Sequence, residues 1–179
     1  DIIFSGAGLP LDLPSYLEKE SKTKLVPIVS SSRAAKLICE KWRNNYDYLP
    51  DAIVVEGPKA GGHLGYKNDQ IEDEHFSLEH IVPEVIEVIK AYEKSGHCKI
   101  PVIAAGGIAD GRGIAAAFML GAKGVQMGTH FVVTDESQVH ENYKERIIKA
   151  KDIDSKVTGR TTGHPVRALR NDMTRKYLE

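Results

Sequence analysis

Short apolar runs alternate with amphipathic stretches along almost the whole chain, and this alternation limits the fold more than any other feature. The apolar runs are brief and rich in β-branched or small residues, and they are apolar at successive positions. That pattern is typical of parallel strands covered on both faces. The amphipathic stretches have helical spacing, as between Val85 and Ile89, where apolar side chains face one way and Glu and Lys the other. Strand–helix alternation of this kind predicts βαβ units and a parallel sheet.

The alternation resolves into individual elements. The predicted strands are Ile2–Ser5, Leu25–Ser30, Ala52–Glu56, Pro101–Ala105 and Gly124–Met127. The predicted helices are Pro14–Ser21, Ser32–Asn44, Leu78–Lys94, Gly113–Leu120 and Gln138–Ala150, followed by a loop and a final helix within residues 154–179. The stretch Gly65–Ser77 is acidic and poor in core residues, so we expect a flexible cover over one end of the sheet.

The positions of the glycines favour one parallel architecture over the other. Glycines follow the ends of four different predicted strands, at Gly6, Gly57, Gly106 and Gly128. Functional loops after many successive strands are typical of the TIM (β/α)₈ barrel, whereas a doubly wound sheet concentrates its glycine fingerprint after the first strand. We therefore predict an α/β fold of the barrel type. Since a closed barrel needs eight strands and about 250 residues, we expect a single domain over residues 1–179 that forms a C-terminal portion with about five of the eight βα units. Further strands are expected before Asp1.

Composition and charge exclude several classes of partner. The formal net charge is −1, without the basic excess that nucleic-acid binding usually shows. The longest apolar runs, such as IPVIAAGGIA, are too short to span a bilayer, and no secretory signal opens the chain, so a cytoplasmic location is expected. Cys39 and Cys98 are expected to be idle thiols. No pair of histidines has metal-ligand spacing with carboxylates, so no metal is expected.

The clearest chemical signal lies in residues 101–129, where one predicted strand ends in Gly106 and Gly107 and the next ends in Gly128 and Thr129. The last two βα loops of a barrel often form a phosphate site. Glycines let backbone N–H groups approach phosphate oxygens closely, and the N-terminus of a following helix favours an anion. Tight turns alone would also require glycine, and that interpretation is preferred for Gly121.

The second signal is the string AIVVEGPKAGGHLG, residues 52–65, in which a buried strand leads into a glycine-rich loop and then His63. An imidazole is the side chain best suited to proton transfer near neutral pH. Because the loop is expected on the same rim as the phosphate site, His63 is the candidate catalytic residue. His130 is kept as a neighbour of the site, and His164 as part of a loop that could fold over the rim. The remaining histidines are interpreted as surface residues: His75, His80, His97 and His140.

Several strings together resemble one enzyme family. EGPKAGGHLG, PVIAAGGIADGRGIAAAFMLGAKGVQMGTHF and TGHPVRAL, with GAGLPLDLP near the start, are similar to the nitronate monooxygenases, formerly called 2-nitropropane dioxygenases. Flavin-type enoyl-ACP reductases share this fold and these motifs. The resemblance covers nearly the whole chain and implies an FMN-binding barrel without a metal. The residues expected to bind FMN are Glu56, Gly61, Gly62, Gly106, Gly107, Gln126, Met127, Gly128 and Thr129.

The resemblance also implies a reaction. His63 matches the family's histidine, which acts as a base toward the acidic carbon of a nitroalkane. Oxygen then completes the oxidation of the alkyl nitronate to a carbonyl compound and nitrite. A small-molecule substrate and oxygen are therefore the expected partners. A homodimer is the oligomeric state considered. Two positions depart from the family pattern: Glu56 stands where many relatives have glutamine, and Lys59 where an acidic residue is frequent.

Three alternative hypotheses about the function are kept. An NAD(P)H-dependent FMN enoyl-ACP reductase would use the same flavin site but take its electrons from a nicotinamide. It would also need a basic patch for the acidic carrier protein, and the lysines and arginines of this chain are scattered. A flavin- or phosphate-binding module without catalysis, and a barrel portion that binds nothing alone, are the remaining alternatives.

Overall fold

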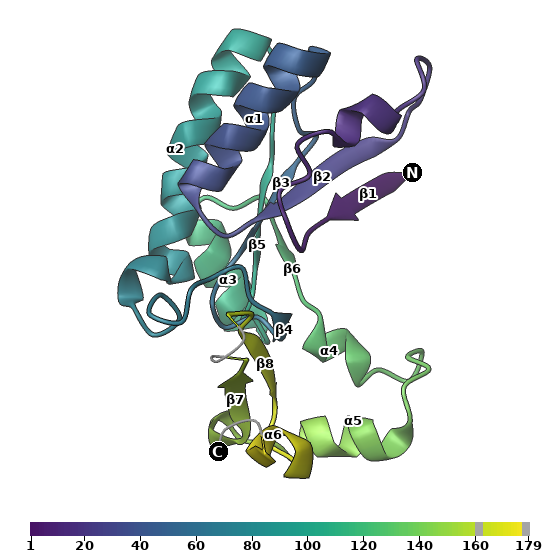
Figure 1. The fold of residues 1–179 in the computed structure, drawn as a ribbon, viewed down its shortest axis with the longest axis vertical. Helices are drawn as coiled ribbons and strands as arrows, with labels where there is room; N and C mark the ends of the chain where they lie inside the picture. Colours follow the sequence, from purple (N-terminus) through teal and green to yellow (C-terminus); the bar gives the residue numbers. More distant parts are fainter. Residues whose placement is uncertain (160–162, 177–179) are drawn as a thin grey trace.

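The computed structural model describes residues 1–159 and 163–176 (Figure 1). Five parallel strands form one sheet in the order β1-β2-β3-β5-β6. They are β1 (Ile2–Ser5), β2 (Lys24–Val29), β3 (Ile53–Glu56), β5 (Val102–Ala105) and β6 (Gly124–Gln126). The five predicted strands and their parallel pairing are thus confirmed, as a curled half-barrel sheet. Its completion to eight βα units stays a prediction.

The two longest helices lie side by side against one face of this sheet (Figure 1). They are α1 (Ser32–Tyr46) and α2 (Leu78–Gly96). Ser31 caps α1 by accepting a hydrogen bond from the backbone N–H of Ala34, and Asp110 caps α3 (Gly111–Met119) in the same way. Shorter helical elements are η1 (Leu13–Tyr16), η2 (Glu74–Phe76), α4 (Thr129–Val132), α5 (Glu141–Ile148), η3 (Asp152–Asp154) and α6 (Asp172–Lys176).

The core explains why the strands are apolar at successive positions. Ile53 and Val55 pack toward the helices in a large cluster with the fully buried Trp42, whereas Val54 belongs to a smaller cluster on the other face with Val26. Side chains alternate between the two faces of a strand, and both faces of β3 are buried. The indole N–H of Trp42 also donates to the carbonyl of Pro10 over 2.8 Å, which fixes the chain after β1 against α1.

One predicted helix, Pro14–Ser21, is wrong. The chain forms only the short 3₁₀ turn η1, and Leu17 after it is already extended. The residues beyond Leu17 are exposed through Lys22, so a longer helix would have no apolar face to bury. Short helices without such packing are marginal in water.

The stretch Gly65–Ser77 is also not the loose cover that its composition suggested. Tyr66 and Ile71 are buried in the main core cluster, and Tyr66 packs edge-on against Phe76 with 6.0 Å between ring centroids. The hydroxyl of Tyr66 donates to the backbone carbonyl of Glu56. Two isolated apolar side chains therefore anchor a segment that is otherwise polar.

A second, smaller sheet was not predicted. We call it the rim sheet; it is antiparallel, has the order β4-β8-β7, and lies beyond the carboxyl ends of the parallel strands (Figure 1). Its strands are β4 (Gly62–His63), β8 (Val166–Leu169) and β7 (Ser155–Thr158). The predicted final helix corresponds to α6, and the parts of that prediction over residues 160–162 and 177–179 lie outside the described residues.

Both cysteines are free thiols, and Cys39 is buried whereas Cys98 is half-buried. Cys39 is fully buried in α1, and this burial, with Cys98 nearby, raises the pKa of its thiol to about 12. Within residues 1–159 and 163–176, no helix has the length and apolar content to cross a membrane. In the same ranges, no group of three His, Cys, Asp or Glu side chains is arranged to hold a metal ion.

Candidate active site

The carboxyl ends of the parallel strands bring two of the predicted glycine loops into direct contact. The backbone N–H of Gly57, just after β3, donates to the carbonyl of Ala105, the last residue of β5, over 2.8 Å. The turn after Gly57 is tight, since the N–H of Ala60 donates back to the carbonyl of Gly57. The loops after β3 and β5 therefore form one continuous backbone surface at the rim.

Gly106 and Gly107 are required by this contact. Both have positive φ, +93° and +82°. A Cβ at Gly106 would lie 2.8 Å from the carbonyl oxygen of Gly57, and one at Gly107 would lie 2.8 Å from Cβ of Lys59. Close packing of the loop after β3 thus accounts for glycine at both positions, and their predicted contact with FMN stays a prediction.

Other predicted glycines border open space instead. A Cβ at Gly62 or at Gly128 would meet no atom within 4 Å. At the neighbouring Gly61, a Cβ would lie 3.5 Å from the hydroxyl oxygen of Thr129 at the start of α4. The loop after β3 and the loop after β6 therefore approach each other at Gly61 and Thr129. On either side, bare backbone is accessible to a ligand.

Glu56, Gln126 and Met127 sit at the strand ends behind these loops. All three are half-buried, and Gln126 is paired with Ala105 in the sheet. Burial of the Glu56 side chain raises the pKa of its carboxyl above the usual range. The carboxyl therefore keeps its proton to a higher pH than an exposed glutamate does.

His63 lies at the rim, exposed, as the second residue of β4. Its register partner is Val166 of β8, and the next residue, Leu64, donates its backbone N–H to the carbonyl of Pro165. His63 is thus carried by the rim sheet and not by the parallel strands. His164 and His130 are exposed as well, His130 packing edge-on against Phe131.

Sequence reasoning missed two residues that hold the site together. Tyr66 supports the end of β3 through the carbonyl of Glu56, as described above. Arg167 of β8 donates from Nη2 to the carbonyl of Pro58 over 3.0 Å. Arg167 belongs to the string TGHPVRAL that carried part of the family resemblance, but its contact spans 109 residues of sequence and no local pattern reveals it.

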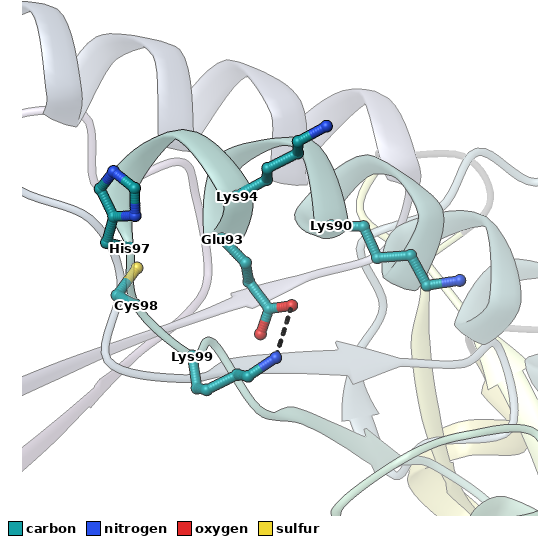
Figure 2. A pocket seen from close by; sticks show the side chains of 6 residues that line it. All are labelled: Lys90, Glu93, Lys94, His97, Cys98 and Lys99. Carbon is teal, nitrogen blue, oxygen red and sulfur yellow. Dashed lines mark ion pairs between the residues drawn. The ribbon is translucent and has the colours of Figure 1, made fainter.

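A hollow of about 550 Å³ lies at the opposite end of the sheet, where α2 ends and the chain turns toward β5. Figure 2 shows its lining, which includes an ion pair of 3.9 Å between Lys99 and Glu93. The lining residues are Lys90, Glu93, Lys94, His97, Cys98 and Lys99. Most of these side chains are exposed, and none comes from the loops after the strands, so this hollow is not part of the candidate site.

Comparisons with known proteins show what the chain is similar to. The family model described as nitronate monooxygenase matches residues 1–179. A probable nitronate monooxygenase of Staphylococcus saprophyticus is 38% identical over 131 residues, which are 72% of this chain and 34% of that protein. The corresponding protein of Staphylococcus aureus strain JH9 is 39% identical over 122 residues, 68% of this chain and 32% of its own length. The chain thus spans about a third of the length of these curated relatives.

Two solved structures resemble the whole described fold. FabK from Thermotoga maritima is 41% identical, with a TM-score of 0.76 over 98% of this chain and 48% of that chain. The nitroalkane oxidase from Streptomyces ansochromogenes is 28% identical, with a TM-score of 0.72 over 98% of this chain and 46% of that one.

Proposed function

Since the chain belongs to the nitronate monooxygenase family, we propose that it forms the active-site part of an FMN-dependent oxidoreductase that oxidises alkyl nitronates. The proposed reaction consumes molecular oxygen and yields a carbonyl compound and nitrite. The observation that carries the proposal is open glycine backbone at two places: at Gly62, next in sequence to the exposed His63, and at Gly128, in the loop that approaches Gly61 through Thr129. The cytoplasmic location and the homodimer stay predictions.

The residues at this rim fit a phosphorylated flat cofactor. Bare backbone at Gly128 and the hydroxyl of Thr129 suit a phosphate, because close approach of N–H and O–H donors is what an anion requires. We propose that Gly107 and the run Gln126–Thr129 hold the phosphate and ribityl chain, with Gly106 supporting that loop. We assign the ring side to Glu56, Gly61 and Gly62. When bound, FMN supplies the redox chemistry that carries electrons from the substrate to oxygen.

His63 performs the proton step of the proposed reaction. Toward a neutral nitroalkane, a ring nitrogen of His63 removes the acidic proton from the carbon that bears the nitro group. Toward a nitronate, which has already lost that proton, an N–H of the His63 imidazole helps to bind the anion instead. The imidazole is exposed at the rim, so a small substrate can reach it from solvent.

Glu56 can fill the place that glutamine occupies in many relatives. Burial holds its carboxyl in the protonated form to a higher pH. A protonated carboxyl has one O–H donor and one carbonyl acceptor, as a glutamine amide has a donor and an acceptor. As long as Glu56 keeps its proton, the departure from the family pattern therefore preserves hydrogen bonding toward the ring side of the site.

The decisive experiment measures oxygen uptake and nitrite release by the purified protein loaded with FMN, with a small alkyl nitronate and without NAD(P)H. We expect uptake with wild type. His63→Ala should lower kcat/KM for the neutral nitroalkane by about 10²–10⁴-fold, the usual contribution of a general base. The matched control is His97→Asn, since His97 is exposed at the far end of α2, beside the hollow at the opposite end of the sheet, and asparagine tolerates its positive φ. Equal losses with nitronate and nitroalkane would contradict the role of His63 as a base.

A second candidate function is the reduction of an enoyl thioester by NAD(P)H. The specific observation in its favour is the higher identity to FabK, 41%, than to the nitroalkane oxidase, 28%. The two activities differ in their source of electrons. Absence of oxygen uptake with nitronate, together with NADH oxidation on adding an enoyl thioester, would replace the first proposal by the second.

A further inference from the structure

Arg167 ties the rim sheet to the loop that leads to His63. In the register of β4 and β8 it lies directly opposite Gly62, and in that of β7 and β8 opposite Val157. Its Nη2 donates to the carbonyl of Pro58 over 3.0 Å, and its Nη1 donates to the hydroxyl of Ser155 over 3.3 Å. One side chain therefore connects β7 to the loop after β3.

The loop that Arg167 contacts is packed elsewhere against the glycines of the proposed flavin site. Gly57 and Ala60 lie where a Cβ of Gly106 would be, and the stem of Lys59 lies where a Cβ of Gly107 would be. The segment 57–63 is thus held by the glycines after β5 and by the hydrogen bond from Arg167 to Pro58. Its position fixes the start of β4, and with it the backbone of His63.

Burying part of a guanidinium group is costly, and this cost indicates that both of its terminal nitrogens are needed for hydrogen bonds here. The side chain is half-buried, and its Nε is fully buried without a hydrogen-bond partner among the described residues. This burial lowers the pKa of the guanidinium, an effect that the charge of Glu72 opposes. An apolar residue would avoid that cost, and a lysine would present a single ammonium group. Only a planar guanidinium reaches two acceptors in a fixed geometry.

We propose that Arg167 is a positioning residue that holds the segment 57–63 in place and so sets where the imidazole of His63 meets the substrate. This inference deepens the proposed function and rests on it for the kinetic consequence. The structural consequence is independent of any activity. Arg167 acts here only through the backbone of the loop.

The structural consequence is tested by amide hydrogen exchange on the protein without added substrate. In Arg167→Lys and Arg167→Met, exchange within residues 57–66 should rise by about tenfold, as expected for a lost charge-assisted hydrogen bond. Exchange in β2, β3 and β5 should not change. The matched control is Arg170→Met, which removes the same charge from an exposed side chain just after β8. A rise spread evenly over the parallel sheet, or no rise at all, would overturn the proposal.

The kinetic consequence separates positioning from general stability. Misplacement of His63 by about 1 Å should lower kcat for the neutral nitroalkane by about 10²-fold. The nitronate, which needs no proton removal, should lose much less. Guanidinium ion in solution should restore part of the nitroalkane activity in Arg167→Ala. Equal losses with both substrates would overturn the proposal.

The two tests fail in different ways. If wild type turns over neither nitro compound, the proposed function fails, and the hydrogen-exchange result alone decides the role of Arg167. If Arg167→Met does not fold, Arg167→Lys keeps the charge and the stem and loses only the fork. Exchange in residues 57–66 of Arg167→Lys equal to wild type would then overturn the proposal.

Discussion

The centre of the parallel sheet and the rim sheet are built on different physical principles. Ile53, Val54 and Val55 of β3 are all 0% exposed, whereas every residue of β7 and β8 is half-buried and both residues of β4 are exposed. Apolar burial stabilises the first region, and hydrogen bonds between distant residues shape the second. The chain thus separates a buried scaffold, the parallel sheet with α1 and α2, from a more exposed surface that carries the proposed base. Function is often placed on such surface segments of lower local stability.

The largest expected effect lies in the scaffold. Trp42→Ala should lower the free energy of unfolding by about 3–5 kcal/mol, because it removes a fully buried aromatic side chain and leaves a cavity. Urea denaturation followed by circular dichroism measures the change. The control is Tyr16→Ala, since Tyr16 is 75% exposed and should cost little. Similar losses of stability for the two variants would contradict the distinction between a buried centre and an exposed periphery.

A smaller effect is expected at the polar edge of the scaffold, where the carboxylate of Asp51 accepts hydrogen bonds from Lys24, Tyr48 and the backbone N–H of Leu25. Asp51→Asn should lower the free energy of unfolding by about 2 kcal/mol, the usual range for hydrogen bonds to a charged group.

The pH dependence at Asp51 follows from its pKa. Burial alone would raise the pKa of the Asp51 carboxyl, but the hydrogen bonds from Lys24, Tyr48 and Leu25 outweigh it and lower the pKa below its usual value of 3.8. The stabilisation is therefore present above about pH 4 and is lost as the pH falls through the lower, folded-state pKa. Urea denaturation of wild type and Asp51→Asn at pH 7 and pH 3 measures it. A stability difference as large at pH 3 as at pH 7 would contradict this account.

At the rim, two glycines should respond differently to alanine. Gly107→Ala should lower the free energy of unfolding by about 1–2 kcal/mol, because φ is +82° and the new methyl group meets Lys59. Gly128→Ala should change stability by less than about 0.5 kcal/mol, since its φ is −98° and open space surrounds it. FMN titration followed by flavin fluorescence should nevertheless show weaker binding for Gly128→Ala. Unchanged FMN affinity would remove Gly128 from the proposed phosphate site.

The smallest effect is expected for Glu56→Gln. At a pH below the raised pKa of Glu56, the variant should keep kcat/KM within about threefold of wild type, because there the amide replaces a protonated carboxyl with a similar hydrogen-bonding pattern. As the pH rises through the raised pKa of Glu56, wild type should lose activity and the variant should not. Profiles of kcat/KM against pH for both proteins measure this. Parallel profiles would show that the proton on Glu56 has no part in the reaction.

The scaffold could be predicted because each of its elements carries its own signal. The five predicted apolar runs form the five parallel strands of the structure. The helix predicted at Pro14–Ser21 was wrong because this stretch has residues of helical propensity but no apolar face that could pack against the sheet. The segment around Tyr66 was predicted to be flexible, yet Tyr66 is buried in the core. A local polar composition does not reveal this burial, because it depends on contacts with residues that are distant in sequence.

Part of the geometry around the candidate site was also predictable. Glycines after successive strands predicted loops that meet at one rim, and the loops after β3 and β5 do meet. The rim sheet was not predictable, since β4 has only two residues and its partner is more than a hundred residues away. The role of Arg167 depends entirely on that pairing.

The pairing of β4 with β8 has a consequence for biosynthesis. During translation the parallel sheet can assemble once the residues up to β6 have left the ribosome, since all its strands lie before Met127. β4 must wait for β8, which emerges some forty residues later. At a typical rate of about 5–20 residues per second, a nascent chain therefore holds the five-stranded sheet for a few seconds before β8 can pair with β4 and fix the backbone of His63. The proposed proton-transfer group is therefore positioned only after the five parallel strands have emerged, so a chain that stops before β8 would have this sheet but no positioned base.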